Sequence, residues 1–140
     1  MSRINIGRTV VGGLLAGLVV NVNEFVLNTV VLGEDMDRAM LALNVPAIGN
    51  QAIARFVVLG FALGIATIWL YATIRPRFGP GVPTAVIAGV TVWFFAYLYS
   101  GAGMVIMQLF PGRLMATSIV WGLFELVIAA IAGAWVYTEV

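Results

Sequence analysis

Long apolar stretches dominate the chain, and short polar breaks separate them. Four stretches contain at most one charged residue each: residues 10–32, 54–74, 83–109 and 114–137. At about 1.5 Å per residue, each is long enough to cross a hydrocarbon core of roughly 30 Å as an α-helix. The pattern therefore predicts an all-α membrane protein with four transmembrane helices, which form a single domain over residues 1–140.

The three breaks indicate how these helices connect. The first, GEDMDRAMLALNVPAIGNQ, starts with acidic residues suited to a helix N-terminus and then places methionines and leucines among polar residues. It predicts a short interfacial helix after the first span. The second break, RPRFGPGVP, and the third, FPGR, are rich in proline and glycine, as tight connections are. The four spans are therefore expected to form two tandem hairpins.

The two hairpins resemble each other in sequence. IATIWLYATI at residues 65–74 matches IAGAWVYTEV at 131–140, and LAGLVVNVNEFVLN at 15–28 aligns with IAGVTVWFFAYLYS at 87–100. A duplicated hairpin would explain both matches, and because both copies start on the same side, the repeat would be parallel, with its two-fold axis along the membrane normal. The alternative is chance similarity between apolar helices of biased composition.

Composition supports a membrane location and excludes several kinds of chemistry. Hydrophobic residues make up 62% of the chain and charged residues 9%, and a mean hydropathy of +1.07 lies outside the range of soluble domains. The chain has no Cys, His or Lys, which excludes thiolate catalysis, His-ligated haem or zinc, and lysine Schiff bases from its own residues. We expect no cofactor, and Asp35 with Asp37 lacks the further ligands of a metal site.

Charge also bears on partners and orientation. A net charge of +1 without a basic stripe argues against nucleic-acid binding, so the expected partners are the lipid bilayer and further copies or other membrane subunits. The arginines divide into two groups: Arg3, Arg8, Arg75 and Arg77 on the side of the termini, and Arg38, Arg55 and Arg113 on the other. This bias predicts a multi-pass membrane protein with both termini in the cytoplasm.

Two acids inside predicted spans, Glu24 and Glu125, are the most informative residues. A carboxylate in hydrocarbon costs at least a few kcal/mol, so such residues usually face a bundle interior and often mark a site. Glu24 follows Val10 by fourteen residues and Glu125 precedes Tyr137 by twelve, on helices of opposite direction. Their depths therefore differ by roughly 3 Å. If the two carboxyl groups meet, their mutual repulsion would keep at least one protonated at neutral pH.

Polar and small residues accompany these acids at helical spacing. Gly13, Gly17, Asn21, Glu24 and Asn28 lie on one face of the first helix, and Glu125 lies among small residues of the last, so these two faces are expected to pack together. We predict an intramembrane polar or ion site formed by Glu24, Glu125, Asn21 and Asn28, with Arg55 as the possible counter-ion. The expected helix-packing residues are Gly13, Gly17, Gly60, Gly64, Ala129 and Gly133.

Each of these patterns has a structural alternative. One or both acids could be protonated groups that hold helices together by hydrogen bonds, or could pair with an arginine or a partner subunit. The aromatic run of Trp93, Phe94, Phe95, Tyr97 and Tyr99 could line a quinone, pigment or lipid-tail groove, although such clusters more often serve packing.

Three phrases carry a resemblance over nearly the whole chain: GGLLAGLVVNVNEFVLN, GFALGIATIWLYATIRPRFGPG and WGLFELVIAAIAGAW. The chain resembles small four-helix integral membrane proteins of bacteria. That group has no known activity, so the resemblance implies a fold and no function.

Two functions are consistent with these observations. The first is a non-enzymatic membrane protein that acts as an oligomeric or accessory subunit of a membrane complex, which agrees with small-residue patterns on every helix. The alternative is a small proton- or cation-coupled transporter or channel that uses the intramembrane carboxyl groups. An enzyme is not expected, because the chain offers no evident nucleophile or metal cluster.

Overall fold

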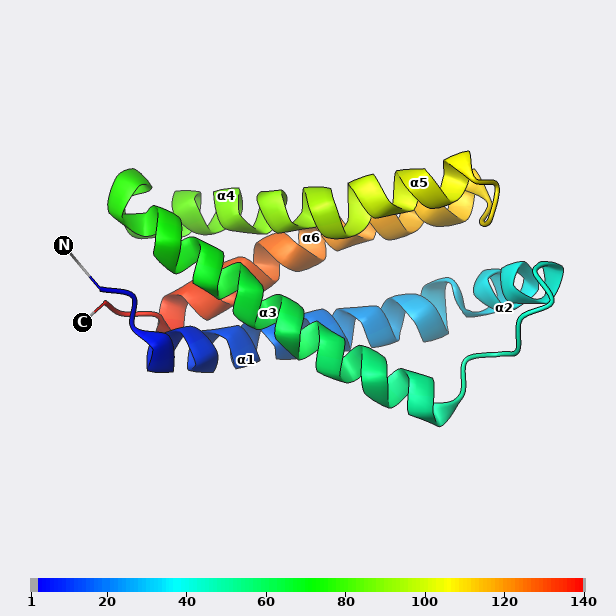
Figure 1. Cartoon of the computed structure of the whole chain (residues 1–140), viewed down its shortest axis with the longest axis horizontal. Helices are drawn as coiled ribbons and strands as arrows, with labels where there is room; N and C mark the ends of the chain where they lie inside the picture. The colour runs from blue at the N-terminus through cyan, green and yellow to red at the C-terminus, as the bar shows by residue number, and fades with distance from the viewer. Residues whose placement is uncertain (1–2, 140) are drawn as a thin grey trace.

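The computed structural model describes residues 3–139, and their regular structure is entirely helical (Figure 1). The elements are α1 (Ile6–Val26), the π-helical η1 (Leu27–Val31), α2 (Gly33–Ala42), α3 (Asn50–Phe78), α4 (Val82–Trp93), the π-helical η2 (Phe94–Tyr99), α5 (Ser100–Ile106) and α6 (Gly112–Val136). Four continuous helices are long and apolar enough to cross a membrane: Ile6–Val31, Asn50–Phe78, Val82–Ile106 and Gly112–Val136. The predicted all-α fold, with four long apolar helices and a short helix after the first, is confirmed.

Helix α3 is longer than the sequence pattern suggested. It begins at Asn50 and continues through Pro76 to Phe78, although we expected Arg75 to begin a tight connection. Because Pro76 lies in the last turn, its missing N–H removes only one helical hydrogen bond. The helix ends where Gly79 adopts a φ of 85°, a conformation that glycine tolerates better than other residues.

Glycines allow α1 and α3 to pack closely. A Cβ atom at Gly17 would lie 2.7 Å from the Phe61 Cα atom, and one at Gly64 would lie 2.6 Å from the Gly17 Cα atom. Gly13 has the same relation to the backbone of Ile65. In lipid, where hydrophobic burial does not drive helices together, such backbone approach allows the dispersion contacts that hold a pair. These glycines therefore make α1 and α3 a tight first hairpin.

The contact between α1 and α6 uses a different glycine of α1. A Cβ atom at Gly12 would lie 2.6 Å from the Gly133 carbonyl oxygen, and one at Gly133 would lie 2.6 Å from the Gly12 oxygen. Gly13 and Gly17 instead face α3. The expectation that this part of the helix face packs on α6 was therefore wrong. A one-residue rotation of about 100° on the helix separates the two faces. Ala129, also on α6, is fully buried in the core.

Contacts in the two hairpins fall at positions that the sequence repeat makes equivalent. Gly17 lies against Gly60 and Phe61 of α3, and Gly89 lies against Leu126 and Val127 of α6. The repeat aligns residue 17 with 89, 60 with 126, and 61 with 127. Both hairpins thus place a glycine of the first helix against the same two positions of the second.

The repeated tyrosines make a similar pair of contacts at the ends of the two hairpins. The hydroxyl of Tyr71 accepts a 3.2 Å hydrogen bond from the backbone N–H of Gly81, which precedes α4. That of Tyr137 accepts one of 3.2 Å from Asn5, which precedes α1. Their rings meet edge to face with centroids 5.8 Å apart. A similar contact therefore joins the end of each hairpin to the start of the other, although the repeat aligns Asn5 with Arg77 and not with Gly81.

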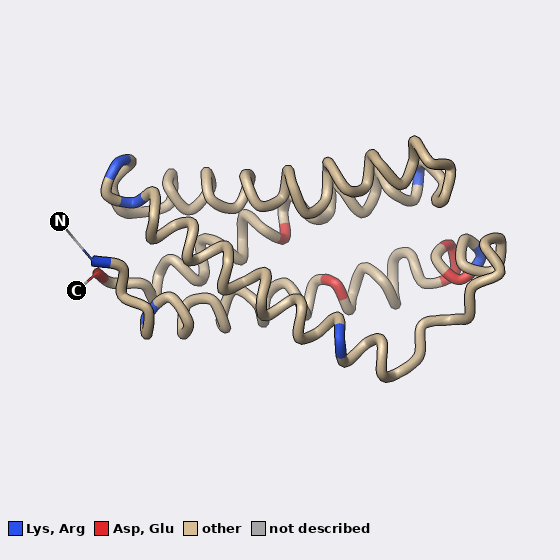
Figure 2. Tube along the Cα trace, viewed as in Figure 1, with Lys and Arg blue, Asp and Glu red and all other residues tan. Residues whose placement is uncertain are grey.

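Charged residues gather at the two ends of the bundle, as Figure 2 shows. Between the ends lie only Glu24 on α1, Glu125 on α6 and Arg55 near the start of α3, within the described residues. The apolar core is divided accordingly. One cluster of buried residues lies toward the termini and includes Ala16, Val20, Ile68, Leu126 and Ala129, and a smaller one toward α2 comprises Leu27, Leu32, Ala39 and Leu114. The two acids lie between these clusters.

Candidate functional site

The side chain of Tyr97 connects the two intramembrane acids. Its hydroxyl oxygen lies 2.8 Å from Glu24 Oε1 and 2.5 Å from Glu125 Oε2. Three helical segments therefore meet at one hydroxyl group: α1 supplies Glu24, η2 supplies Tyr97 and α6 supplies Glu125. The matched depth of the two acids brings them to opposite sides of the same phenol.

The number of hydrogens available at this contact limits the protonation states of Glu24 and Glu125. A phenol carries one hydrogen and can donate it to only one of the two carboxyl groups. The other short contact is a hydrogen bond only if that carboxyl group is protonated and donates to the Tyr97 oxygen. The three side chains are therefore satisfied together when at least one acid is neutral, and the second carboxyl group can then accept from the phenol in either protonation state.

The surroundings of the two acids differ and indicate which one carries the charge. Glu24 is partly exposed, and its Oε2 accepts a 2.9 Å hydrogen bond from Asn28 Nδ2, so both of its carboxyl oxygens have a donor. Glu125 is only 1% exposed, and its Oε1 has no partner within the described residues. Since a buried charge without donors is far more costly than a neutral acid, this arrangement favours an ionised Glu24 and a neutral Glu125.

Local backbone geometry positions the two partners of Glu24. Both lie in π-helical segments, Asn28 in η1 and Tyr97 in η2. Such segments insert an extra residue into a helical turn, re-aim the side chains there and frequently occur at functional sites. Opposite Tyr97, Gly122 leaves room for the ring, because a Cβ atom there would lie 2.6 to 2.8 Å from three ring atoms.

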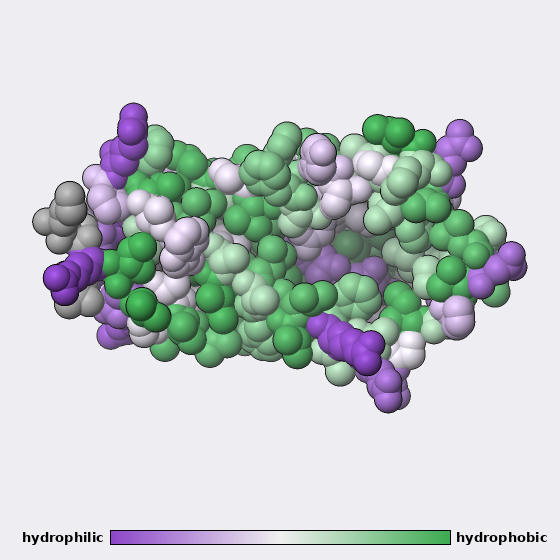
Figure 3. All heavy atoms as spheres, in the orientation of Figure 1, coloured by the Kyte–Doolittle hydropathy of each residue, from purple (hydrophilic) through white to green (hydrophobic). Residues whose placement is uncertain are grey.

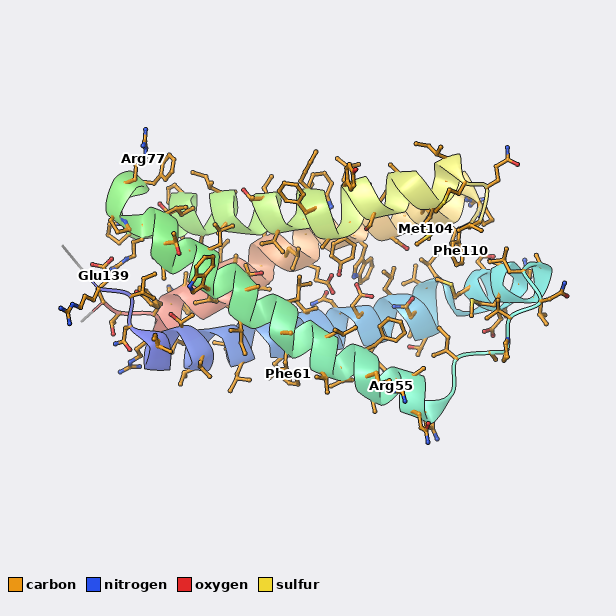
Figure 4. The ribbon with its side chains drawn as sticks, viewed as in Figure 1. Arg55, Phe61, Arg77, Met104, Phe110 and Glu139 are labelled. Atoms are coloured by element: carbon orange, nitrogen blue, oxygen red, sulfur yellow. The ribbon has the colours of Figure 1, made fainter. Side chains whose placement is uncertain are left out.

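Asn21 and Arg55 lie outside this cluster. The Nδ2 of Asn21 donates a 3.1 Å hydrogen bond to the Val57 carbonyl oxygen, which links α1 to α3. Arg55 lies near the start of α3, where this helix diverges from the rest of the bundle (Figure 4). The ion pairs between residues 3 and 139 are Arg38–Glu34, Arg38–Asp35 and Arg75–Glu139, so Arg55 reaches neither intramembrane acid.

The polar cluster lies beside a hollow in the molecular surface. Figure 3 shows hydrophilic atoms at the floor of this hollow, between α3 and the side of the bundle formed by α4 and α5. At the far end, Phe110 lies between α5 and α2 (Figure 4) and packs on the small apolar cluster. The described residues contain no group of three His, Cys, Asp or Glu side chains that could hold a metal ion. A phenol hydroxyl between two carboxyl groups is an arrangement suited to hydrogen bonding and proton transfer.

Comparison with known proteins assigns no family to the chain. No family model matches it, and neither curated proteins nor solved structures provide a match. What the helices establish is a small membrane protein with four long apolar helices.

Sequence reasoning missed the central role of Tyr97. The residue belongs to an aromatic run that we interpreted as packing or as a groove lining, and its depth relative to the acids was not considered. Gly122 was also left out of the site. The spacing between Gly122 and Glu125, one turn apart on α6, was the signal that an aromatic ring could lie beside this acid.

Proposed function

We propose that this protein is a small, non-enzymatic proton-coupled transporter. The observation that carries the proposal is the hydroxyl of Tyr97, which lies between the carboxyl groups of Glu24 and Glu125 inside the bundle. A proton can pass along such a chain when the phenol donates to one acid as it accepts from the other. Paired acids of this kind are typical of proton relays in pumps and transporters.

The different packing on the two sides of the site supports transport by alternating access. Toward the termini, fully buried small residues close the bundle: Ala16, Ala85, Ala88, Ala129 and Ala130. Toward α2, Asn28 and Thr29 are exposed beside Glu24. This difference between the two sides supports a cluster that is open toward α2 and closed toward the termini, as a coupled transporter requires at any moment. The parallel repeat offers two similar hairpins that could move relative to each other.

Reconstituted vesicles test this function. With pyranine inside and an imposed pH gradient, the protein should dissipate the gradient in exchange for Na⁺ or K⁺ supplied on the opposite side. The double variant Glu24→Gln with Glu125→Gln should reduce the rate to that of empty vesicles, since neither amide can release a proton. The matched control is Asp37→Asn, which neutralises an exposed acid of α2. Absence of flux at every pH, or flux that the double variant retains, would refute the proposal.

A second candidate function is an oligomeric or accessory subunit of a membrane complex. Residues 53–59 of α3 are all exposed, and this stretch includes Arg55, which has no ion pair within residues 3–139. An arginine inside a membrane span usually pairs with an acid or reaches the interface. Native mass spectrometry of the protein extracted with its lipid should then show a stoichiometric assembly that Arg55→Gln disrupts. A monomer in native lipid would refute this second candidate.

For the orientation, we propose cytoplasmic termini in a bacterial inner membrane. The four arginines near the termini outnumber the three on the other side, and basic residues favour the cytoplasmic face. A reporter that is active only in the cytoplasm should be active when it is fused to the C-terminus. Activity of a second reporter that works only after export, fused at the same position, would overturn this orientation.

A further inference from the structure

A small pocket lies beside Glu125, between residues of α1 and α6. It has a volume of about 250 Å³ and is lined by Asn23, Trp121, Phe124, Glu125 and Ile128. Since an apolar cavity of about 150 Å³ already accommodates benzene, this one has room for a single aromatic ring with a short chain. Phe124 and Ile128 are exposed, so the pocket borders the lipid.

Two of the residues that line the pocket have a buried polar atom without a hydrogen-bond partner. These atoms are Glu125 Oε1 and Trp121 Nε1. The two residues are four apart on α6 and therefore lie on the same face. By contrast, Trp93 Nε1 donates a 2.7 Å hydrogen bond to the Ile119 carbonyl oxygen. Because buried polar groups are nearly always paired, two orphan atoms at one pocket indicate a missing polar group.

The chemistry of the two atoms selects the kind of group. An indole N–H can only donate, and Oε1 of a neutral Glu125, whose proton lies on Oε2 toward Tyr97, can only accept. A group that carries both an acceptor and a donor satisfies both atoms, and a hydroxyl, which accepts from Trp121 and donates to Glu125, is the smallest such group. An ammonium group has no acceptor for the indole, and a carbonyl has no hydrogen for the carboxyl oxygen.

We infer that this pocket binds the hydroxyl group of an apolar alcohol or phenol that enters from the hydrocarbon region of the membrane. The inference rests on the proposed function in that it names the substrate class of the same proton site. A hydroxyl bound at Glu125 is hydrogen-bonded through that residue to Tyr97 and Glu24. Binding and protonation would thereby act on the same group of atoms.

Indole NMR of the protein in nanodiscs, with ¹⁵N-labelled tryptophan, tests the inference. The Trp121 resonance is assigned from its loss in Trp121→Phe, and 4-propylphenol serves as the probe. We expect this resonance to shift saturably with 4-propylphenol and not with propylbenzene, which has the same apolar body without the hydroxyl. The resonance of Trp135, which is 88% exposed and lines no part of this pocket, is the internal control.

Two variants of one residue identify the acceptor. Glu125→Gln keeps a carbonyl oxygen and should retain probe binding, whereas Glu125→Leu removes it and should weaken binding about tenfold, as the loss of one buried hydrogen bond does. Retained binding in Glu125→Gln with loss of proton flux separates the two proposals. Flux in a wild-type protein that does not bind the phenol would overturn the pocket assignment alone.

Three results would overturn the inference. The first is an equal response of Trp121 to the phenol and to propylbenzene, which would mean that the hydroxyl is not recognised. The second is no response to either compound. The third is a direct magnetisation transfer from water to the Trp121 indole N–H that the phenol does not displace, which would mean that the pocket holds only water.

Discussion

Replacing each intramembrane acid by its amide should have unequal effects on stability. Glutamine has the shape of a protonated glutamic acid, with an N–H donor where the acid has its O–H. If Glu125 is neutral and donates to Tyr97, Glu125→Gln preserves every hydrogen bond of the cluster. If Glu24 is ionised, Glu24→Gln removes a charge that Tyr97 and Asn28 both stabilise.

The magnitudes follow from these contacts. Hydrogen bonds to charged groups contribute about 1.5–3 kcal/mol and those between neutral groups about 0.5–1.5 kcal/mol, so losing the charge at Glu24 weakens two bonds by about 1 kcal/mol each. Interhelical polar contacts in membrane proteins average about 0.6 kcal/mol, which lowers the expectation. We expect Glu24→Gln to reduce the free energy of unfolding by about 1–2 kcal/mol and Glu125→Gln by less than about 1 kcal/mol.

The assay is reversible unfolding by SDS in mixed micelles at neutral pH, followed by the change in tryptophan fluorescence. Asp37→Asn, in an exposed position of α2, controls for the general effect of removing an acid. A larger loss of unfolding free energy for Glu125→Gln than for Glu24→Gln would place the charge on Glu125. That result would refute the assignment of the neutral form to Glu125. Small and equal losses would show that both acids are neutral and serve as structural hydrogen-bonding groups.

Three further substitutions probe the same cluster and the helix packing. Tyr97→Phe removes the hydroxyl between the two acids and should cost about 1–3 kcal/mol in the same unfolding assay. The control is Tyr99→Phe, at a residue that is 72% exposed, which should change stability by less than about 0.5 kcal/mol. Equal effects of the two substitutions would contradict the bridging role of Tyr97. Gly122→Ala introduces a methyl group against the Tyr97 ring and should cost about 1–3 kcal/mol and reduce proton flux. Gly64→Ala should destabilise by a similar amount through the α1–α3 contact without a selective effect on flux. Gly103→Ala, where a Cβ atom meets nothing within 4 Å, is the control for both glycine variants, and a loss of stability there as large as theirs would refute the packing argument.

The one-dimensional pattern of the chain was sufficient for the helices and their order. Because a membrane span must satisfy its backbone internally and be apolar over about 20 residues, four stretches with at most one charged residue each predict four helices with little dependence on tertiary structure. The same reasoning located Glu24 and Glu125 at similar depth, since depth depends only on position along a helix of known rise. Asn28, one turn from Glu24, followed from helical spacing alone.

Contacts across helices depended on rotation and neighbour identity, which the pattern does not contain. The four spans are apolar on most sides, so their hydrophobic pattern does not reveal which side of α1 meets α3 and which meets α6. The one-residue difference between Gly12 and Gly13 decides this, and only the packed backbone reveals it. For the same reason Tyr97 was grouped with other aromatics until the π-helical turn η2 and Gly122 placed its hydroxyl between the two acids. Sequence therefore determined the spans and the depth of their charges. Tertiary structure decided which side chains contact one another, because that depends on rotations of about 100° per residue between helices of nearly uniform polarity.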